Sequence, residues 1–157
     1  MRILVLYFSL EGHCEKIAKI IKDELGADVE RIVLKKPLPK GLFKYFIGGM
    51  MTLLNKRPEI LPLRYNPEDY DFIFFCSPVW AGNIAAPFNS VISNYKIENK
   101  KIGIFSSYAG VEGNFEKFKS KLSNTDRVII EKAFNERELG TDKAVEEIKS
   151  LLNNINS

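Results

Sequence analysis

The residues best suited to chemistry in this sequence lie in a short polar stretch near its start, between a strand pattern and a helix pattern. Residues 3–6 are branched and apolar, which suits a strand buried on both faces, and apolar residues recur at helical spacing over residues 17–25. Gly12 allows the backbone to come close to a ligand, while the first N–H groups of the helix point outward. Because these groups and the helix dipole favour an anion, the stretch predicts a phosphate site. The alternative is an ordinary turn, in which glycine is also a common residue.

Other reactive groups are few. His13 is the only histidine, so the sequence offers almost no ligands for a metal site and almost no partners for a serine- or cysteine-type catalytic triad. Cys76 ends an apolar run and is expected to be a small core residue, whereas Cys14 at the helix start is either a packing residue or a reactive thiolate. We therefore expect no catalytic side chain and no metal, so that any reaction depends on a cofactor.

Length and composition are those of one globular domain over residues 1–157. No apolar run reaches 18 residues, which predicts no membrane span, and the chain opens directly into a strand instead of a signal segment, so a cytoplasmic protein is expected. The net charge of +3 is too small to indicate nucleic-acid binding, and no zinc-finger spacing or RNP pattern is present. We expect no nucleic-acid partner.

Strand and helix patterns alternate five times along the chain. Strands are expected at residues 3–6, 28–34, 70–76, 101–106 and 127–133, and helical patterns follow them, the fourth carrying Phe115, Phe118 and Leu122. Gly26 is expected to end the first helix and Thr141 to cap the last. The alternation predicts an α/β fold: a three-layer, doubly wound, five-stranded parallel sheet in the order 2-1-3-4-5. The loops after strands one, three and four then meet at the carboxyl edge, where such sheets bind ligands.

The segment between the second and third strands breaks the pattern. A basic, proline-containing linker at residues 35–41 precedes an apolar helix at residues 42–54, which contains Gly48 and Gly49. Two glycines cost about 2 kcal/mol in a helix interior, so the helix needs packing to persist. Residues 35–64 carry seven basic side chains and one acidic, a balance of +6. Two interpretations are open: a solvated basic rim around a helix that packs on the core or forms a homodimer, and a docking surface for an acidic partner or an anionic membrane.

The chain resembles the flavodoxin-like family over essentially its whole length. The resemblance is carried by three loops, which occur in the same order as in the family. Residues 7–14 are similar to the family's FMN-phosphate loop, residues 77–83 to its ring-binding loop, and residues 106–110 to the loop that closes the other side of the flavin. The resemblance implies FMN as the cofactor, with residues 81–83 near the ring N5. The cofactor-binding residues that it implies are Ser9, Glu11, Gly12, His13, Cys14, Pro78, Val79, Trp80, Ala81, Gly82, Asn83, Ser107, Tyr108, Ala109 and Gly110.

The first loop departs from the family, which often has Thr-Gly-Asn-Thr where residues 11–14 are Glu-Gly-His-Cys. Ionised Glu11 cannot donate a hydrogen bond and would repel a phosphate, so its side chain is expected to point away while backbone N–H groups act as donors. Protonated His13 would add a charge-assisted contact. Trp80 and Tyr108 are expected to flank the flavin ring, although Trp80 could simply line the surface and Tyr108 could cap the core.

The resemblance supports three hypotheses. The main one is an FMN-binding electron carrier of flavodoxin type, although such carriers are usually acidic and this chain has a pI of about 8.8. The alternative is an FMN-dependent NAD(P)H:quinone-type oxidoreductase. The third is a binding module that has kept the fold and lost the cofactor, because residues 11–14 differ from the family. The expected partner is a redox protein or a small electron acceptor.

Overall fold

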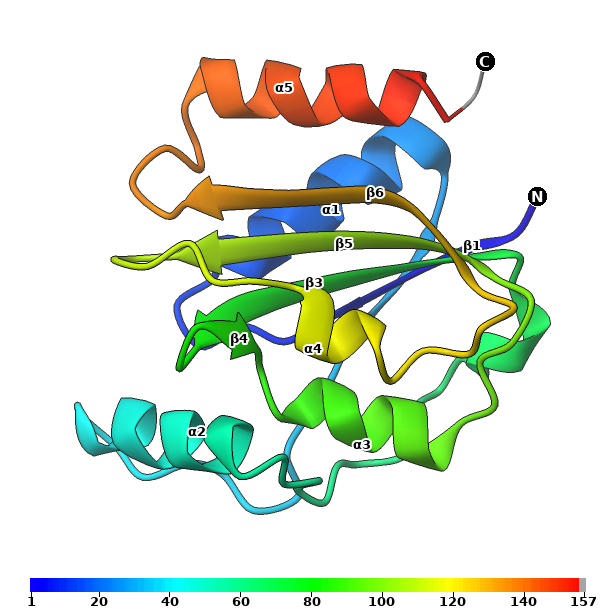
Figure 1. Cartoon of the computed structure of the whole chain (residues 1–157). Helices are drawn as coiled ribbons and strands as arrows, with labels where there is room; N and C mark the ends of the chain where they lie inside the picture. The colour runs from blue at the N-terminus through cyan, green and yellow to red at the C-terminus, as the bar shows by residue number, and fades with distance from the viewer. Residues whose placement is uncertain (156–157) are drawn as a thin grey trace.

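The computed structural model describes residues 1–155 and has three layers, with a parallel sheet between two sets of helices (Figure 1). The five parallel strands stand in the order β2-β1-β3-β5-β6, which confirms the predicted order 2-1-3-4-5. Their bounds are β1 (Ile3–Tyr7), β2 (Asp28–Arg31), β3 (Phe72–Trp80), β5 (Lys101–Tyr108) and β6 (Arg127–Asn135). A two-residue strand, β4 (Asn83–Ile84), is added antiparallel to the end of β3.

Helices cover both faces of the sheet. On one side lie α1 (His13–Leu25) and α5 (Asp142–Asn153), and on the other lie α3 (Pro87–Asn94) and α4 (Glu116–Lys119) (Figure 1). Helix α2 (Phe43–Leu53) lies at the outer edge of the second side, and a 3₁₀ turn, η1 (Pro67–Asp69), precedes β3. Within residues 1–155, no helix combines the length and the apolar content needed to cross a bilayer.

The central strands alternate between two cores, as strands covered on both faces must. In β3, Phe72 and Phe74 pack in the α1/α5 core, whereas Ile73 and Phe75 pack in the α3/α4 core, and all four side chains are fully buried. Gly103 of β5 leaves room for this packing, since a Cβ there would lie 2.4 Å from the Phe74 ring. The sheet centre therefore holds β1, β3 and β5 rigidly in place.

Both predicted helix ends are confirmed. Gly26 has a left-handed backbone (φ 65°) and donates its N–H to the Lys22 carbonyl, which closes α1. The Thr141 hydroxyl accepts a hydrogen bond from the Ala144 N–H and starts α5.

Several predicted boundaries were wrong, and three of them differ by three residues or more for identifiable reasons. The second strand ends at Arg31 instead of residue 34, because its neighbour β1 ends at the paired Tyr7. The fourth helix spans only Glu116–Lys119, because a turn follows in which the Asp126 carboxylate accepts the N–H of Ser123. Residues 77–80, predicted as a loop, continue β3, because Ser77 and Pro78 pair with β5 and the next two residues pair with β4.

Candidate functional site

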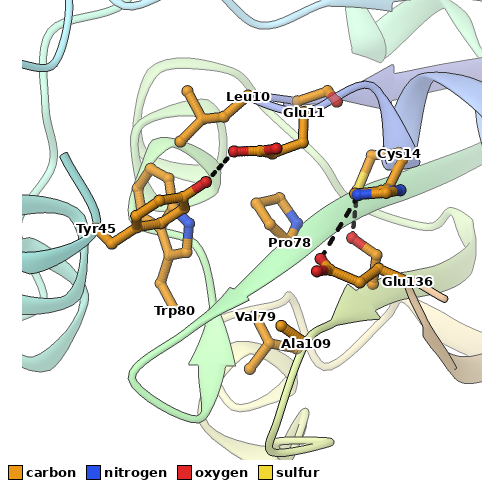
Figure 2. Close-up of a pocket in the computed structure, with 12 residues that line it drawn as sticks. Leu10, Glu11, Cys14, Tyr45, Pro78, Val79, Trp80, Ala109 and Glu136 are labelled. Atoms are coloured by element: carbon orange, nitrogen blue, oxygen red, sulfur yellow. Dashed lines mark hydrogen bonds and ion pairs between the residues drawn. The ribbon is translucent and has the colours of Figure 1, made fainter. Parts of the chain in front are cut away.

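A cavity of about 200 Å³ lies where the loops after β1, β3 and β5 meet, at the edge predicted for a ligand (Figure 2). The loop before α1 forms one wall, the ends of β3 and β5 form the floor, and a side chain of α2 reaches across it. The lining residues are Ser9, Leu10, Glu11, His13, Cys14, Tyr45, Pro78, Val79, Trp80, Ser107, Ala109 and Glu136.

The α1 end of the cavity has the features of an anion site. Gly12 caps α1 with a left-handed backbone (φ 88°), and no side chain caps the helix. The Gly12 N–H donates to the Ser9 hydroxyl at 2.8 Å, so this buried serine holds the loop in shape. The N–H groups of residues 13–15, in the first turn of the helix, have no acceptor within it. Together with the dipole of a 13-residue helix, they favour a phosphate.

Cys14 is a packing residue. Its side chain is 1% exposed, and its sulfur lies 3.4 Å from the Ser107 hydroxyl. Burial raises the pKa of the Cys14 thiol to about 12, which removes the reactive-thiolate alternative. Cys76 is also fully buried, and burial raises the pKa of its thiol, so the expectation of a small core residue is confirmed.

His13 contributes an unpaired polar atom beside the anion site. Its Nε2 lies 3.6 Å from the Glu136 carboxylate, while its Nδ1 is buried and has no hydrogen-bond partner among the described residues. A buried polar atom without a partner is costly, and a bound ligand is one way to satisfy it. The backbone N–H of Glu136 donates to the Tyr108 carbonyl, which fixes the start of the β6–α5 loop at this edge.

A contact between Glu11 and α2 crosses the cavity. The Tyr45 hydroxyl donates to the Glu11 carboxylate (Figure 2). Lys44 Nζ lies 3.6 Å from the same carboxylate oxygen. This hydrogen bond is the main cause that lowers the pKa of Glu11, and it raises the pKa of Tyr45 to about 12. The Glu11 carboxylate is directed toward Tyr45 instead of toward Cys14 at the helix start (Figure 2). We call this Tyr45–Glu11 contact the latch.

Trp80 forms the wall beneath α2 and is only 5% exposed. Its ring meets Phe8 edge-on at 5.3 Å, and a Cβ on Gly48 would lie 3.0 Å from it. Gly48 was expected to destabilise the predicted helix. In the structure its missing side chain lets α2 pack directly on the Trp80 ring. Flanking of a flavin ring by Trp80 stays a prediction, and it requires α2 or the latch to move.

Several residues predicted for the site lie outside this cavity. Ala81 and Gly82 both have positive φ (49° and 72°) and form a tight hairpin turn that leads Asn83 away into β4. Tyr108 follows the lining residue Ser107 on a strand, where successive side chains point to opposite faces. The predicted residues that do not line the cavity are Gly12, Ala81, Gly82, Asn83, Tyr108 and Gly110.

Three lining residues were not predicted. Leu10 lies between the predicted residues Ser9 and Glu11. Glu136 directly follows the fifth parallel strand, so its position at the carboxyl edge was a usable signal. Tyr45 comes from α2, whose placement over the cavity had no signal in the local pattern.

The residues present fit FMN at both ends. Backbone donors at α1 suit the phosphate, and Pro78, Val79 and Trp80 offer apolar surface for a ring. The volume of about 200 Å³ is below the roughly 300–1,000 Å³ typical of pockets for larger ligands. The cavity therefore has to widen to hold all of FMN, and opening the latch is a movement that would widen it.

A second hollow of about 470 Å³ adjoins the cavity and shares Leu10 with it. Its floor is apolar, with Phe8, Ile32 and Leu34 among its lining residues. Its cations are Arg31, Lys40 and Lys44. Arg31 Nη2 donates to the Ser9 carbonyl at 2.8 Å and so joins this hollow to the loop of the anion site.

Comparison with protein families gives a match over residues 1–122, to the family described as NADPH-dependent FMN reductase. Among solved structures, a flavoprotein from Lactobacillus acidophilus in complex with FMN is 24% identical, with a TM-score of 0.68 over 88% of this chain and 96% of the other. A WrbA-like flavodoxin from Agrobacterium tumefaciens is 16% identical, with a TM-score of 0.63 over 94% and 90%. An azoreductase from Bacillus anthracis is 14% identical, with a TM-score of 0.51 over 96% and 94%. These structures share the fold found here.

Proposed function

Since this chain belongs to the NADPH-dependent FMN reductase family and binds FMN, we propose that it is an FMN-dependent oxidoreductase that uses NAD(P)H to reduce a quinone or a similar small acceptor. The family and the likeness to an azoreductase support an enzyme over the electron carrier that was the main hypothesis from the sequence. The net charge of +3 also supports an enzyme, because electron carriers of flavodoxin type are usually acidic.

The proposed reaction balances without a further reductant. NADPH gives up a hydride, which carries two electrons and one proton, and water supplies a second proton. The quinone gains two electrons and two protons and leaves as the quinol. FMN held in the cavity would supply the two-electron redox chemistry that links the two substrates.

The observation that carries this proposal is the cationic hollow beside the cavity. An enzyme that oxidises NADPH must hold the dinucleotide's phosphates near the flavin, whereas a carrier needs no such second site. Arg31, Lys40 and Lys44 are suited to phosphates, and the apolar floor suits an adenine or nicotinamide ring. The shared residue Leu10 places this hollow directly beside the cavity.

The chain's own residues have separable tasks in this proposal. Ser9 holds the loop so that the N–H groups of the first turn of α1 can bind the FMN phosphate. Before FMN binds, the latch directs the Glu11 carboxylate away from the place of that phosphate. Pro78, Val79 and Trp80 exclude water from the ring.

Steady-state oxidation of NADPH by the FMN-loaded protein, with a water-soluble quinone, tests the proposal. Replacing both Arg31 and Lys40 by alanine is expected to raise the KM for NADPH about tenfold or more, because each lost phosphate contact is a charge-assisted hydrogen bond. The matched control is Lys19→Ala with Lys143→Ala, two exposed cations on the α1/α5 side. A protein that binds FMN but does not oxidise NADPH would support the electron-carrier hypothesis. A protein that does not bind FMN would support the binding module that has lost its cofactor.

A further inference from the structure

The outer side of α2 and the linker before it, residues 35–57, form a surface whose exposed apolar side chains, apart from Tyr45 in the cavity, have no role in the proposed reaction. Of the twelve large hydrophobic side chains exposed within the described part of the chain, seven lie in residues 42–54. They are Leu42, Phe43, Tyr45, Phe46, Met50, Leu53 and Leu54. Their exposure is large, 84% for Leu42 and 60% for Phe46. A concentration of this kind marks an interaction site.

Helix α2 is apolar on both of its sides, for different reasons. Its inner side is built from small residues: Gly48 lies on Trp80, and the Thr52 hydroxyl donates to the Gly48 carbonyl and accepts from the Ala86 N–H. Its outer side carries Phe43 and Phe46, whose rings stack on each other at 5.8 Å. A helix that is apolar all round is normally buried, so the outer side needs a cover.

The outer side forms a regular stripe along the helix. Phe43, Phe46, Met50 and Leu53 follow one another at spacings of three, four and three residues, which places them on one face. Figure 1 shows α2 at the outer edge of the molecule, away from α1 and α5. All four side chains are exposed, so the stripe is accessible along the helix.

Charge around this stripe has one sign. Residues 35–58 contain no Asp or Glu, and their cations are Lys35, Lys36, Lys40, Lys44, Lys56 and Arg57. Lys35 pairs with Glu59 at 3.4 Å and Lys44 with Glu11 at 3.6 Å. Lys36, Lys40 and Lys56 are exposed at the two ends of the segment.

We propose that the α2 surface docks on an anionic lipid bilayer, with the apolar stripe in the interface and Lys36 and Lys56 on the headgroups. Exposed Phe and Leu side chains flanked by Lys and Arg on a short helix are the combination that such a surface binds. The helix has 11 residues and is about 16 Å long, so it lies on the bilayer and cannot cross the hydrocarbon core of about 30 Å.

Charge complementarity favours the bilayer over a second copy of this chain. A twofold contact through α2 would bring the cations of one copy against those of the other, with no carboxylate between residues 35 and 58 to offset them. An anionic lipid surface supplies negative charge over a broad plane and accepts the apolar stripe at the same time.

Docking in this way places the proposed redox site at the lipid surface. Tyr45 of α2 lines the cavity, and Lys40 and Lys44 line the hollow beside it. A step that rests on the proposed function follows: the acceptor is a quinone dissolved in the bilayer, which reaches the site from the membrane side.

Vesicle flotation of the FMN-loaded full chain tests the docking directly. We expect binding to phosphatidylcholine vesicles that contain phosphatidylglycerol, weak binding without it, and loss of binding at high salt. Phe46→Ser is expected to lower partitioning about tenfold through lost apolar burial. Lys36→Gln with Lys56→Gln is expected to lower it roughly fivefold for each cation removed.

Matched controls lie elsewhere on the surface. Val111→Ser removes another exposed apolar side chain, and Lys19→Gln with Lys143→Gln removes two cations on the α1/α5 side, so both should bind as the wild type does. Equal binding of all variants, no binding to anionic vesicles, or a stable dimer that Phe46→Ser dissociates would overturn the proposal. The last result would assign the surface to a second copy.

Turnover separates this inference from the proposed function. The wild type and Phe46→Ser should reduce a water-soluble quinone equally, whereas a quinone held in anionic vesicles should be reduced about tenfold faster by the wild type. Normal turnover with the soluble quinone but no vesicle binding would refute the docking alone. Vesicle binding without any turnover would refute the proposed reductase activity but would still support docking of the α2 surface on the bilayer.

Discussion

The two walls of the cavity are built in opposite ways. The α1 wall continues directly from β1, all of whose residues are buried, and its loop is fixed by the Ser9–Gly12 hydrogen bond. The α2 wall belongs to a helix whose outer side is exposed and which reaches the cavity mainly through Gly48 against Trp80 and Tyr45 against Glu11. The first wall is preformed for a phosphate, whereas the second must move to admit a ring.

The largest expected effect comes from the rigid wall. Gly12→Ala places a side chain at φ 88°, which costs about 1–2 kcal/mol in a left-handed conformation and distorts the N–H groups at the start of α1. We expect the Kd for FMN, measured by flavin fluorescence, to rise roughly 5- to 30-fold.

Gly26→Ala is the matched control, because Gly26 also has a left-handed backbone (φ 65°) but lies at the other end of α1. It should destabilise the fold to a similar degree and leave the Kd unchanged. Equal loss of FMN affinity in both variants would show that the α1 wall is not the phosphate site.

The second effect is on stability and concerns the packing of α2 against the Trp80 ring. Gly49→Ala is expected to stabilise the protein by up to about 1 kcal/mol through helix propensity, since its nearest side-chain contact would be at 3.9 Å. Gly48→Ala should lose that gain, because its Cβ would lie 3.0 Å from the Trp80 ring. Urea unfolding measures the difference, and identical stabilities would mean that α2 does not rest on Trp80 in solution.

A smaller effect is expected from the latch. Tyr45→Phe removes the hydroxyl that holds Glu11, so FMN should associate about two- to fivefold faster, as for the loss of an exposed charged contact. Tyr70→Phe is the control, since it removes a comparable bond to the Asp28 carboxylate away from the cavity. A slower association in Tyr45→Phe would mean that Tyr45 assists binding instead of closing the site.

The smallest effect is the pH dependence of the latch. The pKa of Glu11 is lowered by Tyr45 and the pKa of Tyr45 is raised to about 12, so the latch holds at neutral pH. It weakens as the pH falls through the lowered pKa of Glu11, and again as the pH rises through about 12. Stopped-flow FMN association should therefore accelerate in acid for the wild type but not for Glu11→Gln, and the same acceleration in both would place the titration elsewhere.

Sequence patterns predicted the α1 wall and the helix of the α2 wall, but they did not predict that this helix reaches the cavity, for a physical reason. The buried strands 3–6 and 70–76 and the loop around Gly12 are specified locally, by apolar runs and a backbone conformation. Tyr45 reaches Glu11 across 34 residues of sequence, through a helix whose position depends on the Trp80 ring. Such a contact leaves no periodic signal.

The ring-binding loop shows the same limit at a smaller scale. Residues 77–83 carry a family-like motif, but pairing with β5 keeps residues 77–78 in the strand, and the turn at Ala81 and Gly82 moves Asn83 out of the cavity. The pairing partner lies about thirty residues further along the chain. A motif identifies the kind of loop without giving its register.

Anaerobic mixing of the FMN-loaded protein with NADPH shows whether the protein is a reductase or an electron carrier. A reductase should lose its yellow absorbance in a single exponential phase whose rate saturates with NADPH, and addition of a soluble quinone should restore the colour with one quinol formed per NADPH consumed. A flavin that stays oxidised under NADPH, yet bleaches with a chemical reductant, would contradict the account and identify an electron carrier.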